Sequence, residues 1–173
     1  MKILLVVGIT IVAAVGIMWW LGTRLPIKHR AGVAVDLRQT PEAVFDAISD
    51  VVATPQWRKD VKSVELLPAD NGQPRYREAG SNGVIDYRIE LAERPRRLVT
   101  RIDDPSLPFG GSWTFTIAPK GEGSHVEIVE DGEIRSIPFR FLSHYLFGYH
   151  GTLETYANAL ATKSGEQAAI QRL

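Results

Sequence analysis

Six segments in which apolar and polar residues alternate follow one another between positions 61 and 134, separated by turns rich in Gly, Pro and Asn. This alternation is typical of strands with one buried face, and tight turns join antiparallel neighbours. The segments are VKSVELLP, PRYREAG, VIDYRIELAER, RRLVTRIDD, GSWTFTIAP and SHVEIVEDGEI. Because each strand pairs with the next along the chain, the segments predict an antiparallel meander.

A further alternating segment, RAGVAVDLR at positions 30–38, predicts a strand ahead of the meander. The next segment, at positions 40–50, predicts a short helix, because Thr40 suits an N-cap and Pro41 suits the first helical position. Positions 51–60 are predicted to be irregular, with a helical turn. The order is therefore strand, one or two short helices and six strands.

The C-terminal part carries an apolar stripe at helical spacing and predicts one long helix from about Pro138 to Thr162. The stripe contains Phe139, Leu142, Leu146, Tyr149, Leu153, Tyr156 and Leu160. A twisted sheet can curl around such a helix and bury its own apolar face against it. The predicted fold class is α+β: a curved antiparallel sheet of about seven strands wrapped around a long C-terminal helix.

The N-terminal segment at positions 3–22 is uncharged and 20 residues long, which matches the roughly 30 Å hydrocarbon core of a bilayer. Trp19 and Trp20 lie at one end, where indoles favour the membrane interface, and Arg24 follows. A cleaved signal peptide is the alternative, but the apolar run is longer than usual for one and lacks a small-residue cleavage site. We therefore predict a retained transmembrane helix and a membrane localisation.

The predicted domain order is an anchor at 1–23, a linker at 24–28, a ligand-binding domain at 29–163 and a tail at 164–173. The tail has no evident packing partner. Basic residues flank the span on both sides with a small excess on the C-terminal side, which slightly favours a cytoplasmic domain.

Charge and composition exclude several classes of function. The net charge is zero, and removing the first 23 residues takes away only Lys2 and leaves −1, so no nucleic-acid partner is predicted. The chain has no cysteine, and His144 and His150 are too far apart on a helix to bind one metal ion together. No metal site and no cofactor are predicted.

The order of these motifs resembles the START-like helix-grip superfamily, and its polyketide cyclase/dehydrase-like branch in particular (SRPBCC-type ligand-binding proteins). The resemblance covers almost all of positions 29–162. The segments that carry it are TPEAVFDAISDVVATPQWRKDV, YREAG, GGSWTF, VEIVEDGEI and IPFRFLSHYLFGYHGTLETYANAL. It implies a cavity between sheet and long helix for a lipid, sterol, polyketide or other small hydrophobic molecule. It supplies no shared catalytic motif. Most members of the superfamily lack a membrane anchor of the kind predicted here.

Two carboxylates are expected on the inner face of the sheet. If Tyr76 faces inward, then Glu78 does so too, and the alternation of the last strand brings Glu130 inward. A carboxylate in an apolar space has a raised pKa and can act as a general acid or base. The alternative is that each pairs with an arginine, such as Arg140, or lies at the open rim.

Five aromatic residues are further candidates for ligand contact: Trp57, Tyr76, Tyr87, Trp113 and Tyr149. The resemblance places Trp57 near the mouth of the cavity, and the strand and helix patterns turn the others inward. Each ring could orient an apolar ligand through its polar group. Packing in an ordinary core is the alternative for all five.

Three functions fit these features. The first is a membrane-anchored binding or carrier protein for a small hydrophobic ligand. The second is a polyketide cyclase/dehydrase-like enzyme that uses Glu78 or Glu130 to move protons. The third is an interaction protein with a filled core. The sequence favours binding over catalysis and leaves ligand and oligomeric state open.

Overall fold

The computed structural model describes residues 2–173, so Met1 of the predicted anchor lies outside the described residues. The helices are α1 (Lys2–Arg24), α2 (Pro41–Ser49), the 3-10 helix η1 (Val51–Gln56), α3 (Ile137–Leu142), the π-helical turn η2 (Ser143–Phe147) and α4 (Gly151–Lys163). The strands are β1 (Lys28–Leu37), β2 (Val61–Asp70), β3 (Gln73–Gly80), β4 (Gly83–Glu93), β5 (Arg97–Ile102), β6 (Phe109–Lys120), β7 (Gly123–Ile134) and β8 (Gln171–Arg172).

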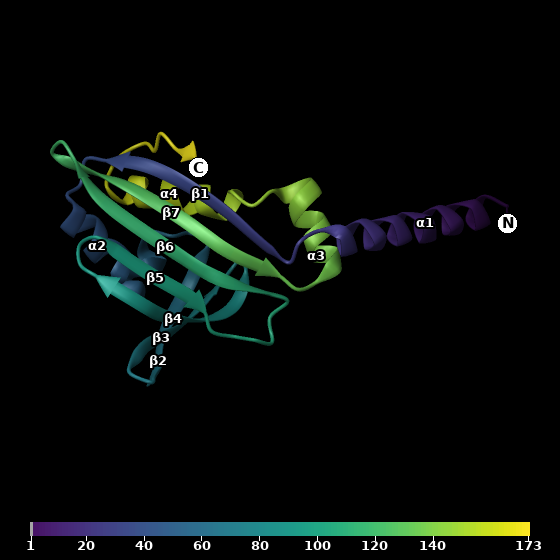
Figure 1. Ribbon diagram of the computed structural model, residues 1–173, viewed down its shortest axis with the longest axis horizontal. Helices are drawn as coiled ribbons and strands as arrows, with labels where there is room; N and C mark the ends of the chain where they lie inside the picture. Colours follow the sequence, from purple (N-terminus) through teal and green to yellow (C-terminus); the bar gives the residue numbers. More distant parts are fainter. Residues whose placement is uncertain (1) are drawn as a thin grey trace.

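The strands form one antiparallel sheet of eight strands in the order β2-β3-β4-β5-β6-β7-β1-β8. The six strands from β2 to β7 pair as sequence neighbours, as the meander predicts, and β1 adds beside β7. Figure 1 shows the curved sheet with α4 against one face and α1 projecting from the domain. The predicted α+β helix-grip fold is confirmed.

The core lies between the inner face of the sheet and helices α2 and α4. Val33 of β1 lies opposite Ile128 of β7, and both are fully buried. Leu153 and Leu160 of α4 are buried with them, as is Phe45 of α2. The hydroxyl oxygen of Thr40 accepts a hydrogen bond from the backbone N–H of Ala43 at 3.4 Å, so the predicted helix cap is present.

The C-terminal helix is not continuous, and the prediction of one helix from Pro138 to Thr162 is wrong in this respect. The backbone of Gly148 adopts φ 71° and ψ −178°, which ends η2, and α4 starts only at Gly151. This combination of dihedral angles is accessible to glycine and strained for other residues. In consequence only the second half of the apolar stripe packs on the sheet, while Phe139 and Leu146 are exposed.

The tail at positions 164–173, for which the sequence indicates no partner, packs on the domain. Strand β8 pairs with β1, and the backbone N–H of Leu173 donates to the carbonyl oxygen of Gly32 at 2.9 Å. Arg172 forms an ion pair with Glu154 of α4 at 2.6 Å. The tail thereby ties the edge of the sheet to α4.

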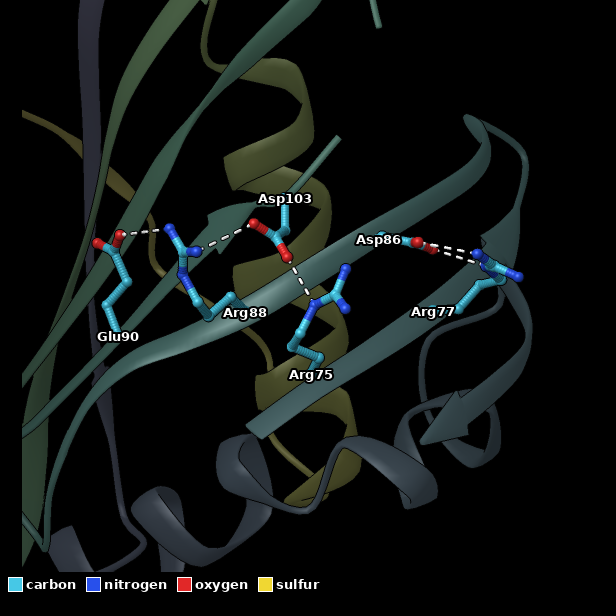
Figure 2. A network of polar contacts seen from close by, with 6 residues as sticks. All are labelled: Arg75, Arg77, Asp86, Arg88, Glu90 and Asp103. Carbon is cyan, nitrogen blue, oxygen red and sulfur yellow. Dashed lines mark hydrogen bonds and ion pairs between the residues drawn. The ribbon is translucent and has the colours of Figure 1, made fainter. Parts of the chain in front are cut away.

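The outer face of the sheet carries a network of ion pairs (Figure 2). Arg75, Arg88 and Arg101 lie side by side across β3, β4 and β5. Asp103 binds Arg75 at 2.6 Å and Arg88 at 3.1 Å, while Glu90 binds Arg101. These acidic groups offset the repulsion between neighbouring guanidinium groups. The network lies on the face opposite to the core.

Candidate functional site

The inner face of the sheet brings most of the predicted site residues together around one tyrosine of α4. Tyr156 makes edge contacts with the rings of Trp57 and Trp113, at centroid distances of 5.4 and 5.6 Å. The rings of Tyr76 and Tyr87, which lie opposite each other on β3 and β4, stack at 5.2 Å. Tyr156 belongs to the predicted stripe but was not predicted as a site residue.

A half-buried ion-pair group lies against these rings. Arg58, just after η1, donates from Nη1 to Oε2 of Glu78 at 3.1 Å and from Nη2 to Oδ2 of Asp60 at 2.5 Å. The side chains of Arg58 and Glu78 are only 14% and 13% exposed. The guanidinium carbon of Arg58 also lies 5.2 Å from the ring centroid of Tyr156, within cation–π range.

The surroundings shift the ionisation of these groups in different directions. Burial raises the pKa of Glu78 above its ordinary value, and the Arg58 charge opposes this without cancelling it. Burial also acts to raise the pKa of Asp60, but the hydrogen bond and charge of Arg58 outweigh it and the pKa falls. Burial raises the pKa of Tyr76, Tyr87 and Tyr156, so their hydroxyl groups remain protonated at neutral pH.

A second polar group lies where β1 begins and β7 nears its end. Nε2 of His29 is 3.8 Å from Oε1 of Glu130, and the His29 ring stacks on Tyr149 at 4.2 Å. Gly132 faces His29 across the strands, and a Cβ atom there would come within 2.3 Å of the imidazole ring. The absence of a side chain at Gly132 therefore makes room for His29.

The carboxylates have different partners from the one suggested by the sequence. Glu78 pairs with an arginine, which is the alternative given above to a catalytic role, but the arginine is Arg58 and not Arg140. Glu130 lies near His29 instead. The suggested partner Arg140 is buried elsewhere and donates from Nη1 to the carbonyl oxygen of Leu25 at 2.9 Å, so its assignment to the carboxylates is wrong.

Four residues of the site were not predicted from the sequence: Arg58, Asp60, His29 and Tyr156. Arg58 and Asp60 lie in the irregular segment after η1, where no periodicity reports the direction of a side chain. The contact of Arg58 with Glu78 on β3 depends on how that segment folds over the sheet. The alternation of β1 could have indicated His29, because it lies on the same face as Ala31 and Val33.

Aromatic side chains occupy the middle of the space where the family resemblance implies a cavity. Phe115 and Tyr156 lie 5.2 Å apart between their ring centroids, and Trp113 touches both. A surface hollow of about 160 Å³ lies between α2 and α4, lined in part by Ala43 and Lys163. It contains none of the predicted ligand-binding residues. A ligand at the predicted site would therefore contact or displace the aromatic rings.

The arrangement combines packed aromatic rings with a small number of polar groups, a composition shared with small-molecule sites. Nε1 of Trp57 is buried and has no hydrogen-bond partner among residues 2–173. It is one of five buried side-chain nitrogen or oxygen atoms in the described residues that lack a hydrogen-bond partner, and it can donate to an oxygen atom of a ligand. Within the described part of the chain, no three His, Asp or Glu side chains come together as a metal site would require.

Several solved structures share this fold. A START superfamily protein from Mycobacterium smegmatis is 22% identical, with a TM-score of 0.63, and the match covers 78% of this chain and 96% of that one. The Zhui aromatase/cyclase from Streptomyces sp. R1128 is 12% identical, with a TM-score of 0.66 and coverages of 80% and 94%. Norcoclaurine synthase from Thalictrum flavum is 10% identical, with a TM-score of 0.61 and coverages of 82% and 88%. At these identities the likeness shows the fold alone.

The sequence comparisons identify the family, whereas the solved structures show the fold alone. No curated protein matches the chain. The family described as polyketide cyclase / dehydrase and lipid transport matches residues 28–155. The match includes every predicted site residue, and together with the solved structures it confirms the resemblance to the START-like superfamily. Because it spans most of the sequence, the chain belongs to the polyketide cyclase/dehydrase and lipid transport family.

Proposed function

We propose that the protein is a membrane-anchored binding or carrier protein for a small hydrophobic ligand that carries at least one oxygen acceptor. The ligand would lie on the inner face of the sheet, among Trp57, Tyr87 and Tyr156. The observation that carries the proposal is the half-buried Arg58–Glu78 ion pair amid these aromatic rings. Charges placed there cost stability relative to apolar packing, so packing of the core alone does not require them.

The family and the related structures support this class of ligand. The family description names lipid transport, and the related structures include an aromatase/cyclase and norcoclaurine synthase. In the proposal, the rings supply apolar contact and the unpaired N–H of Trp57 binds the oxygen acceptor.

The anchor is the second part of the proposal. Leu4–Arg24 is long and apolar enough to cross a membrane, and none of its most apolar part is buried in the domain. Its exposed side chains, among them Ile9 and Val12, would be covered by lipid tails. Intact-mass analysis of the protein isolated from cell membranes tests this. We expect residues 3–22 to be retained, and a mature chain that lacks them would identify a signal peptide.

The proposed orientation in the membrane rests on a small excess of basic residues after the span over Lys2 before it. Arg24, Lys28 and Arg30 follow the span, which favours a cytoplasmic domain. Because the chain has no cysteine, a single Leu66→Cys substitution on the exposed part of β2 gives one reporter thiol. We expect a membrane-impermeant maleimide to label it only after the cells are permeabilised. Labelling of intact cells would reverse the orientation.

Ligand binding can be tested with the full chain extracted from its own membranes. We expect native mass spectrometry to detect a bound apolar molecule, and Glu78→Gln to reduce its occupancy. The matched control is Asp86→Asn on β4, because Asp86 also pairs with an arginine, Arg77, but at the outer face. Repeated absence of a bound molecule, or equal loss in both variants, would contradict the proposal.

Catalysis is the second candidate, and the raised pKa of Glu78 favours it. A carboxylic acid with a raised pKa keeps its proton to a higher pH and can transfer it to a bound carbonyl compound. If the protein is an enzyme, the extracted molecule should lose water or cyclise on incubation with the wild type but not with Glu78→Gln. An unchanged molecule would leave binding as the function.

A further inference from the structure

An exposed apolar segment lies between β7 and α4, in α3 and η2. Phe139, Tyr145, Leu146 and Phe147 are 45%, 52%, 66% and 69% exposed. Other large apolar side chains exposed on the folded domain, such as Leu66 and Val84, occur singly along their strands. Exposed aromatic and aliphatic residues grouped in this way are typical of a surface that binds another protein or a membrane.

This segment is joined to the end of the anchor. Gly22 of α1 packs against Ile137 of α3 so closely that a Cβ atom on Gly22 would come within 2.7 Å of the Ile137 carbonyl oxygen. Arg140 donates to the carbonyl oxygen of Leu25 at 2.9 Å and so fixes α3 to the residues that follow α1. Figure 1 shows α3 beside the end of α1 that adjoins the domain.

The residues at the end of α1 indicate where its contact with α3 would lie relative to a bilayer. Trp19 and Trp20 are exposed at the same end of α1, and the guanidinium carbon of Arg24 lies 5.2 Å from the Trp20 ring centroid. Tryptophan and arginine at the end of an apolar helix are typical of the boundary between hydrocarbon and headgroups. If α1 spans the membrane, α3 therefore lies at that boundary.

The charge of the segment suits the same location. No acidic residue occurs between Glu133 and Glu154 in the sequence. Interfacial helical segments bind membranes through their apolar side chains and are not repelled by anionic headgroups when acidic groups are absent.

The segment also leads directly to one end of the candidate site. Tyr149 follows η2 by two residues and stacks on His29, which lies beside Glu130. A membrane-bound η2 would therefore hold this end of the site close to the lipid.

We propose that α3 and η2 form a membrane-docking surface, in which Phe139, Leu146 and Phe147 enter the bilayer interface beside the anchor. This places the His29–Tyr149 end of the candidate site against the lipid, so that an apolar ligand can pass between bilayer and protein without crossing water. The inference rests on the proposed membrane span of α1 and adds a second contact between protein and membrane.

The absence of cysteine allows a direct test with the full chain. Single-cysteine variants carrying an environment-sensitive fluorophore would be reconstituted in vesicles of phosphatidylcholine and phosphatidylglycerol, with nitroxide-labelled lipids as quenchers. Phe147→Cys and Leu146→Cys report on η2, so that the failure of one variant to fold leaves the other. Ile9→Cys reports on the anchor, and Leu66→Cys, 63% exposed in the structure, is the matched control on β2.

We expect lipid nitroxides to quench the probes at Phe147 and Leu146, with blue-shifted emission, and to leave the Leu66 probe unchanged. Quenching at Ile9 together with an η2 signal equal to that of Leu66 would overturn the docking surface and leave the anchor intact. Absence of quenching at Ile9 would overturn both, whereas the ligand-binding proposal is tested separately by mass spectrometry.

Discussion

Arg58 forms a two-point contact with Glu78: Nη1 lies 3.1 Å from Oε2, and Nη2 lies 3.3 Å from Oε1. The pair joins the segment after η1 to the inner face of β3, beside the rings of Tyr156 and Tyr76. It thus holds the loop that carries Trp57 over the sheet. The geometry of the candidate site therefore depends on this ion pair.

Removal of Arg58 should destabilise the protein. Arg58→Met leaves the carboxylates of Glu78 and Asp60 without their shared cation, and we expect a loss of about 2 to 3 kcal/mol, below the roughly 3 to 5 kcal/mol of fully buried pairs. Chemical unfolding of the full chain in detergent would measure this. Arg77→Met is the control on the outer face, where the loss should stay below about 1 kcal/mol. Equal losses would show that Arg58 has no special role.

The raised pKa of Glu78 gives a defined dependence of stability on pH. Burial raises this pKa above the ordinary value of 4.5, so the folded state binds the proton more tightly than the unfolded state. The contribution of Glu78 to stability is therefore present below 4.5 and is lost as the pH rises through the raised value. Gln does not titrate, so the Glu78→Gln variant shows no such loss. The free energy of unfolding of the wild type relative to the variant should therefore fall as the pH rises from 4.5 through the raised pKa.

Asp60 provides a comparison with the opposite sign. Its pKa is lowered below the ordinary value of 3.8, because the contacts with Arg58 outweigh burial. Its contribution to stability is present above 3.8 and is lost as the pH falls through the lowered value. Thermal unfolding of Asp60→Asn and of Glu78→Gln over a series of pH values should therefore give opposite slopes relative to the wild type. Slopes of the same sign would contradict the assigned shifts.

The unpaired N–H of Trp57 should contribute to ligand affinity. Trp57→Phe retains an aromatic ring and removes the donor, so the affinity for a fluorescent fatty acid should fall roughly twofold to tenfold. The n-alkane of the same chain length is the control in a competition assay. It has no hydrogen-bond acceptor, so its affinity should not depend on the N–H of Trp57. Unchanged affinity for the fatty acid would show that the N–H of Trp57 does not bind the ligand and that Trp57 only packs in the core.

The break between η2 and α4 should depend on glycine at one position. Gly148→Ala forces a residue with a side chain into φ 71°, and we expect a destabilisation of about 1 to 3 kcal/mol. No atom lies within 4 Å of a Cβ placed there, so the effect would come from the backbone. Gly151→Ala is the matched control, because its Cβ also meets no atom within 4 Å and it lies in α4. That change should be neutral or stabilising in thermal unfolding.

The fold could be predicted because the chain repeats one pattern consistently. Alternation in six segments gave the meander, and it correctly turned Tyr76 and Glu78 toward the same face. The break at Gly148 could not be predicted, because helical spacing continues through it and periodicity does not report φ. Strand β8 is two residues long, too short for any alternating pattern.

The candidate site could be predicted only in part, because its polar contacts join segments distant in the sequence. Alternation indicates which face a strand residue lies on, but it does not indicate its partner. Arg58 reaches Glu78 across 20 positions, from a segment without regular structure. Arg140 was a reasonable partner by charge, but the packing of α3 on α1 takes it to Leu25.

Photolabelling can determine whether an apolar ligand lies on the inner face of the sheet. The full chain in nanodiscs would be irradiated with a fatty acid that carries a diazirine group, and the labelled residues would be mapped by peptide mass spectrometry. We expect labelling on the inner face, at Trp57, Tyr87 or Tyr156, in addition to labelling on α1. Labelling confined to α1 and the α3–η2 surface, with none on the inner face, would contradict it.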